Sequence, residues 1–116
     1  MTIERIEVSR RLCEAVIHAG TVYLCGQVAD DVKADIRQQT REVLANIDRM
    51  LARAGSGKSR LLTATVYLKS IDDYAAVNEI WDAWTAPGAA PARTCVGGVA
   101  LFSPDALIEI TVAAAK

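Results

Sequence analysis

The chain has 116 residues, of which 52% are hydrophobic and 5% aromatic, and its formal net charge is −1. This length fits a single domain covering residues 1–116, and the near-zero charge excludes the strong electrostatic attraction on which nucleic-acid binding depends. No apolar run approaches the ~18 residues of a membrane span, and the N-terminus lacks the apolar core of a signal peptide. We therefore expect a cytoplasmic protein without membrane or nucleic-acid partners.

The first half of the chain predicts strands followed by one long helix. Residues 3–8 alternate apolar and charged side chains, the period of a half-exposed strand. Residues 15–18 and 21–25 flank Ala19-Gly20, which predicts a hairpin with a tight turn. From Asp35 the spacing becomes helical over about five turns; Asp35 with Gln38 resembles a capping box, and Gly55 suits a C-terminal stop. The stripe of this helix is Ile36, Thr40, Val43, Leu44, Ile47, Met50, Leu51 and Ala54.

The second half predicts a strand, a second helix and two further strands. The strand covers residues 61–69, and the helix begins at about Asp72 and ends before Pro87-Gly88. Residues 91–98 and 105–114 supply the last two strands. The order is then ββ(β)αβαββ, which predicts an α+β fold: a mixed β-sheet with both helices packed on one face. The stripe of the second helix is Tyr74, Val77, Ile80, Trp81 and Trp84.

One segment imitates a phosphate-binding loop. Residues 55–59 read Gly-Ser-Gly-Lys-Ser, but the first glycine of that motif would fall at Ala52. The segment also closes a helix and precedes a strand, whereas a phosphate-binding loop follows a strand and opens a helix. We interpret it as a flexible turn.

Because strand side chains alternate, the predicted strands divide into two sets. The apolar set, which the helices can cover, is Val22, Leu24, Val66, Leu68, Thr94, Val96, Ile108, Ile110 and Val112. The mixed set is Tyr23, Cys25, Thr65, Tyr67, Arg93, Cys95, Gly97, Leu107, Glu109, Thr111 and Ala113. Two helices cannot cover both faces, and the apolar content exceeds the need of one small domain, so we expect another subunit to cover the mixed face.

This division places Arg93 and Cys95 on the same face as Glu109 and Thr111. A sheltered arginine without an acidic partner is a candidate anion site, because an unpaired buried charge is costly. The alternative is an intersubunit salt bridge from Arg93 to Glu109 or another carboxylate. Cys95 has no base near it in the sequence, so a small buried thiol explains it better than a nucleophile.

Metal and nucleophile systems lack their usual residues. The three cysteines, Cys13, Cys25 and Cys95, form no CxxC pair, and His18 is the only histidine. The sequence therefore predicts neither a metal site nor a cofactor.

The order of short motifs resembles the RidA (YjgF) family over nearly the whole chain. The residues that carry this resemblance are Leu24-Cys25-Gly26-Gln27-Val28, Gln39-Thr40, Thr65-Val66-Tyr67-Leu68, Val77-Asn78, Pro91-Ala92-Arg93-Thr94-Cys95-Val96 and Ile108-Glu109-Ile110. The resemblance implies a chorismate-mutase-like subunit, a homotrimer and ligand sites in the clefts between subunits. It also implies hydrolysis of reactive enamines and imines such as 2-aminoacrylate.

The resemblance further implies roles for individual residues. Arg93 would hold the substrate carboxylate with two hydrogen bonds, and the main chain at Cys25, Gly26 and Cys95 would contact the amino or imino end. Asn78 matches a further site position, although hydrogen bonding in the core or an interface explains it equally well.

At the end of the chain, the resemblance places a water-orienting carboxylate two residues after Glu109, where this chain carries Thr111. Arg93 and Thr111 are therefore the candidate catalytic positions, and Glu109 a candidate substrate contact. Threonine cannot act as a general base near neutral pH. The resemblance therefore implies the fold and the carboxylate-binding arginine, and this chain departs from it at the water-orienting position.

Three functions remain open at this point. The first is a deaminase acting on enamines or 2-imino acids that carry a carboxylate. The second is a non-catalytic protein that binds a small carboxylate such as a 2-oxo acid. The third is an RNA-acting translation inhibitor, against which the near-zero charge and the lack of an aromatic stacking platform argue.

Overall fold

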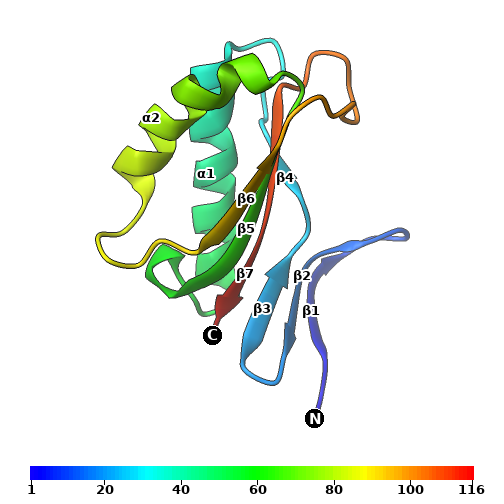
Figure 1. Cartoon of the computed structure of the whole chain (residues 1–116). Coiled ribbons are helices and arrows are strands. Elements are labelled where there is room, and N and C mark those ends of the chain that lie inside the picture. Colours follow the sequence, from blue (N-terminus) through cyan, green and yellow to red (C-terminus); the bar gives the residue numbers. More distant parts are fainter.

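The computed structural model describes residues 1–116 (Figure 1). The strands of the sheet are β1 (Glu4–Val8), β2 (Cys13–His18), β3 (Thr21–Leu24), β4 (Gln27–Val28), β5 (Leu61–Leu68), β6 (Ala92–Val96) and β7 (Ile108–Ala115). The helices are α1 (Ile36–Arg53) and α2 (Tyr74–Trp84), and short 3₁₀ turns cover Lys58–Arg60 and Ile71–Asp73. The second turn is the one departure in the helices, since it occupies the start predicted for α2.

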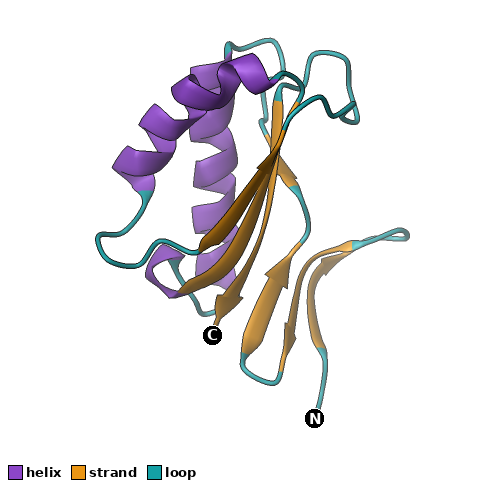
Figure 2. Ribbon diagram, in the orientation of Figure 1, coloured by secondary structure: helices purple, strands orange, loops and turns teal.

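The seven strands form one sheet in the order β1-β2-β3-β7-β5-β6, with β4 paired to β7. Only β5 and β6 are parallel, and all other neighbours are antiparallel. Both helices lie on one face of this sheet, and the other face is open (Figure 2). The predicted α+β fold is confirmed, and neither helix has the length and apolarity needed to cross a membrane.

Local sequence signals explain the long helix and the first hairpin. The Asp35 side chain accepts a hydrogen bond from the backbone N–H of Gln38, which satisfies one of the free donors of the first turn of α1. Ala19 and Gly20 both have positive φ, 51° and 79°, as a tight two-residue hairpin turn requires.

The core lies between the helices and the covered sheet face. Val43, Leu44, Ile47, Met50 and Leu51 of α1 are buried. They pack in one cluster with sheet residues that include Val22, Val66, Leu68, Ile108 and Ile110. Only Val77 and Trp81 of the shorter α2 are buried, so the edge strand β6 is only partly covered.

The orientation predicted for β6 is wrong. Thr94 and Val96 are exposed, whereas Arg93 and Cys95 are half-buried, and Cys95 packs against the core on the helix side. The cause is the register with β5, which pairs Arg93 with Ala64. Ala64 is 2% exposed and faces the helices, so Arg93 faces them as well. Arg93 therefore does not lie on the open face with Glu109 and Thr111.

Candidate functional site

The Arg93 side chain lies between β6 and α2, held by groups that leave part of its guanidinium unpaired. Its Nη2 donates a hydrogen bond to Oδ1 of Asn78, at 2.8 Å. Its Cζ lies 5.1 Å from the ring centroid of Trp81 and 5.9 Å from that of Tyr74. Residues 74, 78 and 81 share one face of α2, because they are one and two helical turns apart.

The charge of Arg93 lacks an acidic partner within the chain. None of the four ion pairs involves Arg93, and its Nη1 is buried without a hydrogen-bond acceptor. The ring faces stabilise the cation without neutralising it, since cation–π contacts contribute about 0.5–2 kcal/mol. A buried donor without an acceptor is unusual in native proteins, so this side chain is suited to an incoming anion.

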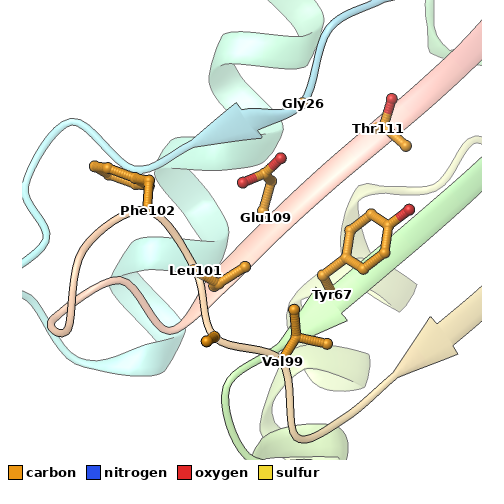
Figure 3. Close-up of a pocket in the computed structure, with 8 residues that line it drawn as sticks. Gly26, Tyr67, Val99, Leu101, Phe102, Glu109 and Thr111 are labelled. Carbon is orange, nitrogen blue, oxygen red and sulfur yellow. The ribbon is translucent and has the colours of Figure 1, made fainter.

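A second group of candidate residues lines a pocket of about 430 Å³ on the open sheet face. In Figure 3, the side chains of Glu109 and Thr111 rise from β7 beside Tyr67 of β5, and the loop after β6 forms the opposite wall. Gly26 lies against the Glu109 carboxylate, which a Cβ at position 26 would overlap. Glycine at this position therefore makes room for the carboxylate.

Glu109, rather than residue 111, supplies the carboxylate of this pocket. The Thr111 hydroxyl donates a hydrogen bond to the carbonyl oxygen of Leu24, at 3.1 Å. Glu109 takes part in none of the four ion pairs, so its carboxylate has no cation bound to it within the chain. The resemblance had assigned the water-orienting position to residue 111, and the geometry places the available acidic group two residues earlier.

Cys25 lies beside this pocket, but its thiol is committed to a neighbour. Its Sγ donates to Oε2 of Glu14, at 2.6 Å. Burial, followed by this hydrogen bond and the charge of Glu14, raises the pKa of the Cys25 thiol to about 12. Gln27 donates from Nε2 to the carbonyl oxygen of Cys25, at 3.1 Å, which fixes the backbone next to Gly26. Cys25 is thus suited to a main-chain contact and not to nucleophilic attack.

The Cys95 thiol is also suited to a structural role. Burial raises the pKa of its thiol, although the nearby Arg93 acts in the opposite direction.

Because β6 is an edge strand, one row of its backbone N–H and C=O groups is unpaired within the chain and is available to a ligand or another subunit.

The structure thus divides the predicted site residues into two groups. Arg93, Asn78 and Cys95 lie together at the edge of the sheet, on the helix side. Gly26, Glu109 and Thr111, with Cys25 beside them, lie on the open face. A single ligand cannot contact both groups within one chain, because the sheet separates them.

Several residues next to these two groups were not recognised as site residues from the sequence. Trp81 and Tyr74 were assigned only to the stripe of α2, yet they flank the guanidinium of Arg93. Val99, Leu101 and Phe102 line the pocket on the open face. The one sign of this in the sequence is the apolar run directly after Gly97-Gly98. Across the described residues, no group of three or more His, Cys, Asp or Glu side chains is arranged to hold a metal ion.

Comparison with known proteins identifies relatives along the entire chain. Residues 2–116 match the family model described as endoribonuclease L-PSP. The RutC family protein YoaB of Escherichia coli is 43% identical over 115 residues, covering 99% of each chain. A RutC family protein of Haemophilus ducreyi is also 43% identical, over 97% of this chain and 96% of its own.

Solved structures agree with the sequence relatives. A protein from Pseudomonas aeruginosa, 43% identical, superposes with a TM-score of 0.95 over 99% of both chains. A member of the YjgF protein family from Neisseria meningitidis, 41% identical, gives 0.96 over 100% of this chain and 96% of its own. The resemblance noted in the motifs is confirmed: this chain belongs to the YjgF/RidA family, the family of the endoribonuclease L-PSP model.

Proposed function

We propose that this protein hydrolyses small imines or enamines that carry a carboxylate, such as 2-aminoacrylate or its 2-imino acid tautomer. The observation that carries the proposal is the buried Nη1 of Arg93, which has no acceptor in a guanidinium already oriented by Asn78. A carboxylate would satisfy this donor, and the planar fork of arginine matches two carboxylate oxygens. Membership of the YjgF/RidA family supports this substrate class.

The proposal requires a second copy of the chain. Arg93 lies at the edge of the sheet on the helix side, and Glu109 lies on the open face. In a ring of subunits, the β6 edge of one copy can face the open pocket of the next, so that Arg93 and Glu109 from different copies reach one ligand. We propose a homotrimer, in which the open face and its exposed Tyr23 and Val96 side chains become buried.

The proposed chemistry needs one oriented water molecule. Glu109 accepts a hydrogen bond from this water and directs its oxygen at the imine carbon, while Arg93 of the other copy holds the carboxylate. Addition of water gives a carbinolamine, and breaking of its C–N bond releases ammonia and leaves the 2-oxo acid. The main chain at Cys25 and Gly26 lies beside Glu109 and would contact the nitrogen end.

The test is an assay of 2-aminoacrylate generated enzymatically, with the wild type beside Arg93→Ala and Arg93→Lys. We expect both variants to lose activity, since lysine lacks the two-pronged geometry. Arg41→Ala, an exposed arginine on α1, serves as the control and should retain activity. Equal activity of Arg93→Ala and the wild type would refute the role of Arg93.

A non-catalytic binder is the second candidate. The observation that favours it is the Thr111 hydroxyl, which donates to a backbone carbonyl and supplies no second acid or base to the pocket. Calorimetry with pyruvate separates the two candidates: Arg93-dependent binding without turnover of any imine would establish the binder. RNA cleavage, to which the description of the family model refers, finds no electrostatic support in a chain with a net charge of −1.

A further inference from the structure

We infer that the loop between β6 and β7 is a specificity wall that selects 2-imino acids with a bulky apolar side chain over the small alanine-derived or serine-derived ones. The wall consists of Val99, Ala100, Leu101 and Phe102, which line the pocket opposite Glu109 and Tyr67. This inference rests on the proposed function and extends it from the reacting group to the substrate side chain.

The wall is apolar in a position where a loop is usually polar. Phe102 is 66% exposed, and Val99 and Leu101 are half-buried. In Figure 3, Leu101 points toward Glu109 and Val99 toward Tyr67, so both side chains face the space in which the substrate would lie. Apolar side chains directed at a pocket are suited to an apolar ligand group.

The loop is held firmly at both ends. At its start, the N–H of Val99 donates to the carbonyl oxygen of Leu68, at 3.1 Å. Gly97 packs so closely on Ile71 that a Cβ at position 97 would lie 2.7 Å from the Ile71 Cβ. These contacts fix where the wall begins relative to β5.

Gln39 of α1 fixes the other end. Its side chain is fully buried; Nε2 donates to the carbonyl oxygen of Asp105, at 3.1 Å, and Oε1 accepts from the N–H of Leu107, at 3.0 Å. Lys69 adds a hydrogen bond from Nζ to the carbonyl oxygen of Pro104, at 2.6 Å. The wall therefore spans two fixed points, and a preorganised wall discriminates between ligands better than a mobile one.

The three groups on the imine carbon then have three separate surroundings. The carboxylate goes to Arg93 of the neighbouring copy, and the nitrogen to the main chain near Gly26. The remaining substituent, the side chain, is directed at the wall, because the wall belongs to the same subunit as Glu109 and faces it. A methyl group would leave most of the apolar surface of the wall exposed to water, whereas a branched or aromatic group would cover it.

The experiment compares the imines of leucine and alanine, each generated by an L-amino-acid oxidase with semicarbazide as the competing trap. We expect the wild type to prefer the leucine-derived imine by about 10-fold or more in kcat/KM, since each methylene in an apolar pocket is worth roughly that factor. Leu101→Ser and Phe102→Ser should reduce this preference by lowering the rate with the leucine imine alone. Leu62→Ser, an exposed leucine on β5 outside the pocket, should leave the preference unchanged.

The failures of the two proposals are distinguishable. Hydrolysis of both imines with no preference, or a preference that Leu101→Ser leaves unchanged, would overturn the wall and leave the proposed function intact. If neither imine is hydrolysed, the proposed function fails, and calorimetry decides on the wall. Binding of 4-methyl-2-oxopentanoate about 10-fold tighter than pyruvate would then support the wall, and equal binding or no binding of the two would overturn it.

Discussion

Gly26→Ala tests the contact on which the proposed chemistry depends. A Cβ at position 26 would overlap the Glu109 carboxylate, and Gly26 is not among the glycines with positive φ. The substitution therefore acts through this overlap and not through backbone strain. The Glu109 side chain can rotate away, so we expect the fold to be retained while the carboxylate leaves its position.

The size of the effect follows from the displacement. The carboxylate must move by more than about 1 Å to reach an ordinary contact distance, and a misplacement of that size can reduce the rate by about 10²-fold. Gly57→Ala is the matched control: Gly57 has an extended φ of −168°, and a Cβ there would meet nothing within 4 Å. We expect kcat for hydrolysis of 2-aminoacrylate to fall in Gly26→Ala and to remain unchanged in Gly57→Ala.

A double-mutant cycle shows whether the loss passes through the carboxylate. In a Glu109→Gln background the carboxylate is already absent, so adding Gly26→Ala should cost little more. Unchanged kcat in Gly26→Ala, or losses that simply add up in the double mutant, would refute the link between Gly26 and Glu109.

Three further predictions concern the pocket and the assembly. Because Glu109 already orients the water in the proposed chemistry, Thr111→Glu, which adds a second carboxylate and removes the hydrogen bond to Leu24, should leave the rate of 2-aminoacrylate hydrolysis unchanged or lower it. A gain approaching about 10²-fold would show that Glu109 does not supply the limiting acid–base group. Because the pKa of Cys25 is raised to about 12 from 9.0, this thiol should resist alkylation by iodoacetamide at pH 9 in the folded protein. The contribution of the protonated thiol to the stability of the fold should be lost as the pH rises above 9 towards 12. Mass spectrometry that shows Cys25 alkylated as fast as in the unfolded chain would contradict this prediction. Light scattering at micromolar concentration should give about three times the 12.4 kDa chain mass, and a monomer would contradict the shared site.

Much of the fold was predictable because the signals were local. The cap at Asp35, the stripe of α1 and the Ala19-Gly20 turn each depend on residues close together in the chain, and all appear where they were expected. The boundaries differ by only a few residues, because the ends of elements depend on tertiary contacts.

The orientation of β6 was not predictable from its own residues. Alternation separates Arg93 and Cys95 from Thr94 and Val96, but it does not show which set faces the helices. The apolar Val96 suggested that Thr94 and Val96 face the helices. In the structure, the pairing of β6 with β5 and the aromatic rings on α2 place Arg93 and Cys95 on the helix side instead. The apolar stem of arginine lets its charge lie against Trp81 on the covered side.

Which residue supplies the acidic group of the pocket was also not predictable from the last strand alone. Glu109 and Thr111 share a face, so their spacing does not show which of them enters the site. Gly26, far away in the sequence, makes the room that Glu109 occupies, and the carbonyl oxygen of Leu24 engages Thr111. The loop wall likewise lacks a periodic pattern that would reveal its direction.

Subunit complementation tests whether each site is built from two copies of the chain. Arg93→Ala and Glu109→Gln should each be inactive alone, because each lacks one half of every site. When the two variants are unfolded together in equal amounts and refolded, about one quarter of the interfaces should join an intact Arg93 from one copy to an intact Glu109 from the next. The mixture should recover about one quarter of the wild-type activity; a mixed oligomer as inactive as its parents would contradict a site shared between subunits.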